Sequence, residues 1–210
     1  MVVRVNDKLV WIDCEMTGLD LQKDALIEVA VLVTDGELNV LGEGVDVIIK
    51  PTDEQLEGMG DFVRDMHIKS GLLDHLADGV TMEEATERIL AHVKEFVPVE
   101  RKAPLAGNTI GTDRAFLARD MAELESWVHY RNLDVSSIKE LARRWYPKVL
   151  YQAPAKGGNH RALADIQESI EEMRYYRETL FVPQPGPTSA EARAVAAKHR
   201  GTLTGLADHT

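Results

Sequence analysis

The sequence has one cysteine and no long apolar segment. A single cysteine, Cys14, excludes a disulfide framework and any zinc site built from several cysteines. No apolar run approaches the ~20 residues needed to cross a bilayer, and the N-terminus lacks the basic-then-apolar order of a signal peptide. We therefore expect a cytoplasmic protein.

Positive charge is also scarce, with 24 Lys and Arg against 35 Asp and Glu and a formal net charge of −11. A surface that holds long nucleic acid needs many cationic side chains, because phosphate contacts supply most of the affinity. The charge therefore argues against a long nucleic-acid partner and leaves a very short one open. With 210 residues and 44% hydrophobic content, the chain can bury the core of one domain.

Apolar segments in the first quarter of the chain predict consecutive β-strands. They are Leu9–Asp13, Ala25–Thr34 and Leu38–Ile49. Asp35-Gly36, between the second and third segments, is a strong hairpin signal. Two further short strands are expected at residues 104–108 and 132–135.

Helices are predicted for most of the remaining chain. Short helical turns are expected at 52–59 and 62–69, and Thr81-Met82-Glu83-Glu84 has the pattern of a capping box that starts the clearest helix. Later helices are predicted over about 112–127, over 137–146 with Ser136 as the cap, and over 161–180. Three strands followed by helices alternating with short strands indicate a mixed α/β sheet with helices packed on it.

The last segment, residues 183–210, differs in composition from the rest. It opens with three prolines at alternate positions and contains an Ala-rich stretch without aromatic residues. We expect a flexible or partly helical tail outside a domain formed by residues 1–182.

Two carboxylates, Asp13 and Glu15, lie one residue apart at the end of the first predicted strand. Because side chains alternate along a strand, both point to one face while Cys14 points to the other. Two acids on one face of a buried strand repel each other and resist desolvation, and a divalent cation is the usual compensation. A strand that ends at the surface with two solvated acids is the alternative, and this short motif alone does not decide between them.

Other polar residues are placed where they could join the same site. Asp113 lies in the first turn of the helix after the 104–108 strand, where α/β proteins carry functional groups, although the helix dipole also favours an acid there. Asp165 lies beside the apolar side of the last helix, and a buried carboxylate needs a partner. His160 can meet Asp165 only from the loop before that helix, because five helical residues would separate them by ~140°.

Four motifs resemble the histidine subgroup of the DEDD-type 3′→5′ exonucleases, and most closely the oligoribonuclease family. They are Trp11–Leu19, Gly107–Arg114, His129–Ser136 and His160–Asp165. The resemblance spans about residues 9–180. It implies a single domain with the ribonuclease H-like fold, a mixed five-stranded sheet flanked by helices. It also implies 3′→5′ hydrolysis of very short oligoribonucleotides, including dinucleotides, to 5′-mononucleotides.

The resemblance implies two divalent cations, Mg²⁺ or Mn²⁺, held by four acids. These are Asp13, Glu15, Asp113 and Asp165, with Asp13 bridging both ions. Such hard cations prefer carboxylate oxygens to sulfur or imidazole. His160 would be the general base that takes a proton from the attacking water, a role that suits imidazole because it changes charge near neutral pH.

Residues that confine the bases are also implied by the resemblance. Leu19 and Phe62 would bracket the bases, and His67 lies in the same region. Phe62 stands where the family commonly has tryptophan, and it offers a smaller stacking surface. Without the resemblance, Leu19 and Phe62 would be interpreted as core residues.

A second group would bind the 5′ end of the substrate. Thr109, Arg131, Ser136 and Ser137 would surround the 5′ phosphate, with Arg131 as the charged anchor. Tyr130 would come from the second protomer of a homodimer. Thr109 stands where serine is usual, which keeps the hydroxyl. The simpler interpretations are a helix cap for Ser136 and a surface ion pair for Arg131.

Two other functions compete with this one. A proofreading-type exonuclease that acts on single-stranded DNA would share the same catalytic residues, but the 130–136 segment and the acidic charge argue against it. A non-catalytic binding module on the same fold is disfavoured, because such a module has no need of clustered acids that repel without a metal.

Overall fold

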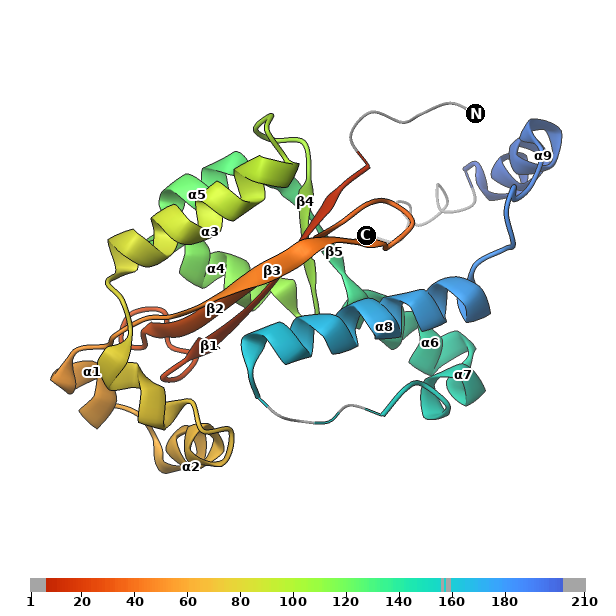
Figure 1. Cartoon of the computed structure of the whole chain (residues 1–210). Helices are drawn as coiled ribbons and strands as arrows, with labels where there is room; N and C mark the ends of the chain where they lie inside the picture. Colours follow the sequence, from red (N-terminus) through yellow and green to blue (C-terminus); the bar gives the residue numbers. More distant parts are fainter. Residues whose placement is uncertain (1–6, 156, 158–159, 202–210) are drawn as a thin grey trace, which may run out of the picture.

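The computed structural model describes residues 7–155, 157 and 160–201. A five-stranded mixed sheet forms its centre (Figure 1). In order across the sheet the strands are β3 (Val40–Ile48), β2 (Leu26–Thr34), β1 (Leu9–Met16), β4 (Pro104–Gly107) and β5 (His129–Asp134). The β1–β2 and β2–β3 pairs are antiparallel, and β4 runs parallel to both β1 and β5. The predicted mixed sheet is confirmed.

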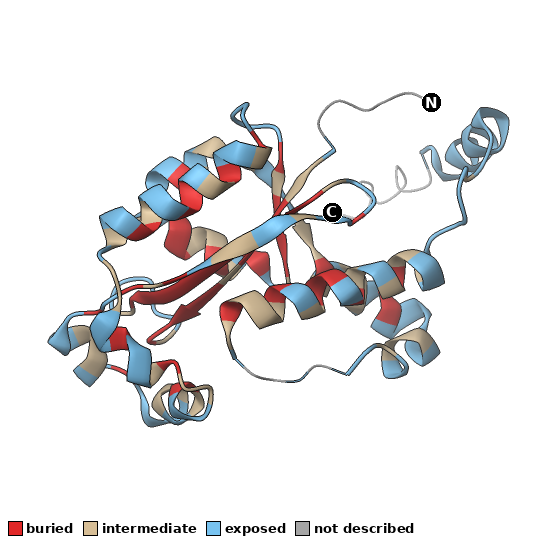
Figure 2. Cartoon of the chain, in the orientation of Figure 1, coloured by how far each residue is buried: buried red, intermediate tan, exposed pale blue. Residues whose placement is uncertain are grey.

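Helices cover both faces of this sheet (Figure 1). One layer consists of α3 (Met82–Phe96), α4 (Ile110–Asp120) and α5 (Ala122–Trp127). The other consists of α6 (Val135–Trp145), α7 (Pro147–Tyr151) and α8 (Ala162–Leu180). Figure 2 shows that the central strands and the sheet-facing sides of the helices are buried. Such two-sided burial explains why β2 is apolar at nearly every position.

Strand β1 divides its side chains between the two layers. Val10 and Ile12 enter the apolar cluster with α3, α4 and α5, whereas Trp11 enters the cluster with α6 and α8. Continuing this alternation, Cys14 joins the first cluster, and Asp13 and Glu15 share the face of Trp11. The acids therefore lie on the side of the sheet that α8 covers.

Short helices lie beyond one end of the sheet (Figure 1). They are α1 (Asp53–Glu57), α2 (Asp61–Lys69) and the 3₁₀ helix η1 (Leu73–Asp78). Their apolar side chains surround Ile27, Met59 and Leu72, which form a third buried cluster. Strand β1 also finishes at this end of the molecule (Figure 1), and its last residues include Glu15.

Several predicted element boundaries need correction. The helix predicted over 112–127 is interrupted at Met121 (φ −127°, ψ 52°), which brings both Met121 and Leu124 into the core. The capping box at Thr81 forms only in part, since the Thr81 hydroxyl accepts from the Glu84 N–H while the Glu84 carboxylate pairs with Arg88. The break at Met121 follows from packing in the core, whereas the Glu84–Arg88 pair is a competing i,i+4 contact within the same helix.

Ser136 is not the cap of its helix. The N-cap of α6 is Asp134, whose side chain accepts from the Ser136 N–H at 2.9 Å. The Ser136 hydroxyl donates to the Asn108 side-chain oxygen at 3.1 Å instead. The carboxylate at the end of β5 thus takes the capping role, because the hydroxyl is used in a contact across the chain.

The segment after α8 carries an exposed helix, α9 (Ser189–His199), which begins with a capping box at Thr188. The proposed division into a domain of residues 1–182 and a tail of 183–210 stays a prediction, and residues 202–210 lie outside the described part. Among the described residues, no helix combines the length and the apolar character that a membrane crossing requires.

Candidate active site

Glu15 lies near the end of β1, directly opposite Glu28 on β2. Both carboxylates are buried, with 8% of Glu15 and 0% of Glu28 exposed. Glu28 accepts hydrogen bonds from the Arg161 side chain. Among the residues that the structure describes, the nearest basic group to Glu15 is His67 Nδ1 at 3.9 Å, and burial lowers the pKa of this histidine. Glu15 is therefore the member of this pair that lacks a strong cationic partner.

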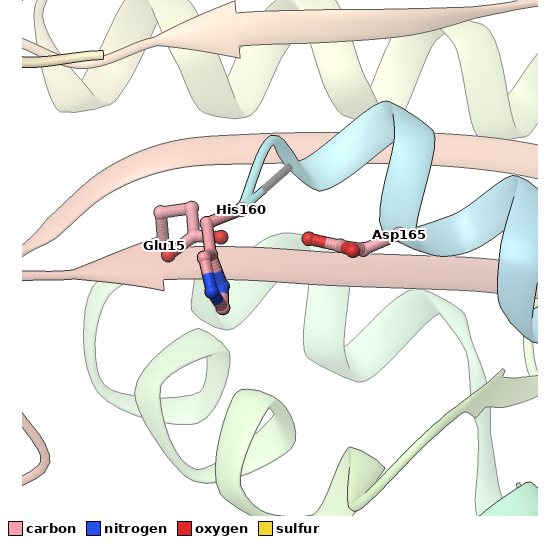
Figure 3. A group of neighbouring side chains, drawn as sticks. All are labelled: Glu15, His160 and Asp165. Atoms are coloured by element: carbon pink, nitrogen blue, oxygen red, sulfur yellow. The ribbon is translucent and has the colours of Figure 1, made fainter. Parts of the chain in front are cut away.

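The start of α8 brings two further groups to Glu15 (Figure 3). His160 lies in the loop just before the helix, as the sequence predicts, and Asp165 lies in the first turn. Potential ligand atoms of Glu15, His160 and Asp165 all lie within 4.8 Å of one another. His160 has a left-handed backbone (φ 47°), which is uncommon for a residue other than glycine and is often found at functional sites.

Asp113 reaches the site from α4. Its Oδ1 accepts from the Cys14 N–H at 3.0 Å. Strand β4 pairs with β1 only as far as Trp11 and Ala106 and ends at Gly107, so the Asp113 carboxylate takes the place of a strand partner for this N–H. The contact holds Asp113, 6% exposed, beside the acids of β1.

The fold disfavours the ionised form of these carboxylates. Burial, followed by the charges of Asp165, Glu28 and Asp113, raises the pKa of Glu15 to about 8. Burial also raises the pKa of Asp113 to about 6. Buried carboxylates that resist ionisation alone are well matched to a divalent cation, which prefers carboxylate oxygens. The donor set therefore fits a divalent metal.

Asp13 and Cys14 complete the description of this end of β1. Asp13 is half-buried and lies on the same face as Glu15. Burial, together with the charges of Asp113 and Asp13, raises the pKa of the Cys14 thiol well above its usual range. A buried thiol of this kind is unreactive, so Cys14 is a core residue and not a nucleophile.

The predicted base-binding residues lie in two different environments. Leu19 and Phe62 are 74% and 83% exposed, so their interpretation as core residues is wrong. His67 is buried. Its Nε2 lies 2.9 Å from the Met16 carbonyl oxygen and its Nδ1 lies 3.9 Å from Glu15. A contact between His67 and a substrate would therefore require α2 to move.

Two of the predicted phosphate-binding residues are in contact. The Thr109 and Ser136 hydroxyl oxygens lie 3.1 Å apart, and the Thr109 N–H donates to Ser136 Oγ and to Asp134, both at 3.0 Å. Thr109 also has a left-handed backbone (φ 56°). Arg131 lies over the exposed ring of Tyr130, 5.5 Å from its centroid, and Ser137 is exposed on α6. Thr109 and Ser136 are thus in direct contact. Arg131 and Ser137 are close to Ser136 in the sequence.

Sequence reasoning missed Glu28 and Arg161. Glu28 stands in the apolar segment Leu26–Thr34, and a charged residue at a position that must be buried is a signal of a specific partner. Arg161 directly follows His160 in one of the motifs, but its partner lies 133 positions away in the chain. The pairing is therefore visible only in the folded molecule.

The fold and the acidic site define a class of nucleases. The RNase_T family model, described as Exonuclease, matches residues 10–173. The structure of exonuclease I from Methylocaldum szegediense has a TM-score of 0.57 and 23% identity over 82% of this chain and 41% of that one. The zinc-bound complex of E. coli exonuclease I with single-stranded DNA has a TM-score of 0.65 and 16% identity over 96% of this chain and 45% of that one. The chain spans less than half of these proteins and shares their fold, which confirms the predicted ribonuclease H-like architecture.

Closer relatives identify the family. Oligoribonuclease of Cutibacterium acnes is 66% identical over 94% of this chain and 98% of the relative. The Streptomyces avermitilis oligoribonuclease is 65% identical over 93% and 98%, and that of Mycobacterium tuberculosis is 57% identical over 92% and 91%. The chain belongs to the oligoribonuclease family, and the predicted enzyme class, a 3′→5′ exoribonuclease, is confirmed.

Proposed function

We propose that the chain hydrolyses very short oligoribonucleotides, dinucleotides included, to 5′-mononucleotides at the acidic site between β1 and α8. The observation that carries this proposal is the convergence of Glu15, His160 and Asp165 within 4.8 Å at the end of a buried strand. The net charge of −11 is consistent with a substrate that has few phosphates. Such fragments arise where cellular RNA is degraded, so we place the enzyme in the cytoplasm.

The four acids hold two divalent cations, Mg²⁺ or Mn²⁺. Asp13, Glu15, Asp113 and Asp165 offer the hard oxygen donors that these ions require. When bound, the cations supply positive charge for the phosphoryl and leaving oxygens and favour ionisation of the attacking water. The raised pKa values of Glu15 and Asp113 support this assignment, since burial disfavours the ionised form of both acids and a bound cation would favour it.

His160 is the general base. Its imidazole is exposed, so a substrate and a water molecule can reach it, and it lies beside Glu15 and Asp165. In this position it takes the proton of the attacking water. Asp165 and Glu15 lie beside the imidazole, so the proton is removed next to the acids that would hold the cations.

The ends of the substrate are held by residues outside the acid cluster. The exposed side chains of Leu19 and Phe62 offer apolar surface for the bases. The Thr109 and Ser136 hydroxyls, with Ser137 and the cationic Arg131, bind the 5′ phosphate. We assign Tyr130, which is 72% exposed, to the pocket of a second protomer in a homodimer.

A cleavage time course tests this function. The protein is incubated with Mg²⁺ or Mn²⁺ and one substrate at a time. The substrates are 5′-phosphorylated RNAs from two nucleotides upward and DNA of the same lengths. The RNA dinucleotide should be cut fastest, and the His160→Ala variant should be slower by ~10²–10⁴-fold while calorimetry shows Mn²⁺ binding largely intact. Equal rates on long RNA or on DNA would instead make the chain a general exonuclease.

A further inference from the structure

We propose that Glu28 and Arg161 are positioning residues that fix His160 against the sheet, so that the imidazole faces Glu15 and Asp165. The inference rests on the proposed role of His160 as general base. Glu28 and Arg161 also act on Glu15 through their charges. The part of their effect that we assign to positioning passes through the backbone that joins Arg161 to His160.

Glu28 is the anchor on the sheet. It is 0% exposed within the fully buried strand β2. One carboxylate oxygen accepts from Arg161 Nε at 2.8 Å and pairs with Arg161 Nη2 at 2.7 Å, and the other accepts from the Ala162 N–H at 3.0 Å. A buried carboxylate is tolerated only when such partners are present. The position of Glu28 therefore fixes the position of both residues.

The hydrogen bond from the Ala162 N–H to Glu28 takes the place of a helix cap. Helix α8 begins at Ala162, and its N-cap residue, Arg161, makes no capping hydrogen bond with its own side chain. The first N–H groups of a helix need an acceptor, and a negative charge at this end is favoured by the helix dipole. Glu28 supplies both from a neighbouring strand, which ties the start of α8 to β2.

Arg161, the residue directly after His160, has a second acidic partner. Its Nη2 lies 3.8 Å from the Asp46 carboxylate on β3, so the guanidinium is placed between acids of two strands. The planar guanidinium makes two contacts with Glu28 in one orientation, which fixes the Arg161 backbone. His160, one residue earlier, is thereby held in its left-handed conformation.

The position of this pair relative to the site supports the same conclusion. Glu28 and Glu15 are directly opposite each other in the β1–β2 register. The contacts that fix the start of α8 are therefore one strand away from Glu15, and Figure 3 shows Glu15 beside His160. A shift of about 1 Å in the imidazole is enough to slow a reaction by ~10²-fold, so a fixed loop matters for rate.

A purely structural role would give a different result. A buried ion pair that only stabilises the fold would change the unfolding temperature, and the rate of the folded fraction would be normal. A positioning role lowers kcat in fully folded protein, and it does so only while His160 is present. These two properties can be measured separately.

The experiment is a double-mutant cycle between Arg161 and His160. Arg161→Gln is made alone and in the His160→Ala background, and kcat and KM are measured on a 5′-phosphorylated RNA dinucleotide at saturating Mn²⁺. With His160 present, Arg161→Gln should lower kcat by ~10–100-fold and leave KM within about twofold. In the His160→Ala background the same change should cost about twofold or less.

Two further variants test the chemistry of the contact. Arg161→Lys keeps the charge and loses the planar fork, so its kcat should lie between those of the wild type and Arg161→Gln. Glu28→Gln keeps the size of the side chain and should resemble Arg161→Gln. If Glu28→Gln or Arg161→Gln fails to fold, Arg161→Lys decides the question, because it keeps a cation beside the buried Glu28 carboxylate and removes only the planar fork.

Thr34→Val is the matched control for lost stability. Thr34 is buried on the same strand and accepts a hydrogen bond from Trp11 Nε1 at 2.9 Å, at the opposite end of β2 from Glu28. Its loss should lower the unfolding temperature while kcat stays unchanged.

The possible failures point to different conclusions. An equal loss of kcat from Arg161→Gln in both backgrounds, with His160→Ala itself slow, would overturn the positioning role alone. A normal rate in His160→Ala would overturn the general-base assignment and the positioning role together.

Discussion

The acid half and the substrate half of the site differ in how far their side chains are buried. Glu15 and Asp113 are buried and held by contacts within the protein, whereas Leu19, Phe62 and Tyr130 extend large apolar or aromatic groups into solvent. The acid half is thus built by the fold itself, and the substrate half offers surface that a ligand or a second protomer would cover. Substitutions in the acid half should lower the rate on every substrate, and substitutions in the substrate half should change the choice among substrates.

The largest expected effect comes from Asp113→Asn. The asparagine oxygen can still accept from the Cys14 N–H, so the contact at 3.0 Å is kept while the negative charge is lost. Because charge stabilisation by a held cation is worth several kcal/mol, we expect kcat/KM to fall by about 10³-fold on RNA of every length.

Asp120→Asn, at the far end of the same helix α4, is the control and should keep wild-type activity. Steady-state kinetics on dinucleotides and on longer RNAs provides the comparison. A loss of less than about tenfold, or a loss confined to one length, would show that Asp113 is not part of the acid half.

An intermediate effect is expected for Arg131→Ala in the substrate half. Hydrogen bonds from a cation to a phosphate are worth about 1.5–3 kcal/mol, so the preference for 5′-phosphorylated over unphosphorylated dinucleotide should fall by ~10–100-fold. The rate on the unphosphorylated dinucleotide should change little, because the acid half is intact.

Arg143→Ala provides the matched control, since Arg143 is an exposed arginine on α6 that pairs with Glu140. Competition between the two dinucleotides in one tube measures the preference directly. An unchanged preference in Arg131→Ala would remove Arg131 from the phosphate site.

The smallest effect concerns pH and stability. The pKa of Glu15 is raised to about 8 and that of Asp113 to about 6, so the protonated forms favour the folded state. The contribution of these acids to stability is complete below their pKa values in the unfolded chain and is lost as pH rises toward 8. These two groups should therefore make the unfolding temperature of the metal-free protein lower at pH 8 than at pH 6.

Mn²⁺ should reverse this trend, because it binds the ionised acids. At ~100-fold excess over Kd we expect Tm to rise by about 5–10 °C at pH 8 and by less at pH 6. Differential scanning fluorimetry with and without Mn²⁺ measures both values, with Asp113→Asn as a variant in which the difference between the two pH values should shrink. Equal shifts at both pH values would contradict the assignment of these acids to a metal.

The sequence alone was sufficient for the sheet and for the geometry of the first two acids. Strand periodicity requires Asp13 and Glu15 to share a face, and the structure has both on the α8 side of β1. The position of His160 before α8 also follows from helical periodicity, because on a continuous helix it could not meet Asp165. These inferences depend on local geometry, which the sequence contains.

Other features depend on contacts between distant segments. The break at Met121 arises because two apolar side chains enter one core, and Asp134 becomes a cap because the Ser136 hydroxyl bonds to Asn108. The contact of Glu28 with Arg161 joins positions 133 apart. No local pattern encodes these choices, since each is decided by which partner the folded chain brings within hydrogen-bonding distance.

The left-handed backbones of Thr109 and His160 have a consequence for protein engineering. This conformation costs a residue other than glycine about 1–2 kcal/mol, and glycine would relieve it. A search for thermostable variants that scores stability alone would favour glycine at both positions. It would then delete the Thr109 hydroxyl that we assign to the 5′ phosphate and the His160 imidazole that we assign to the reaction, so both positions need to be held constant in any stabilised library.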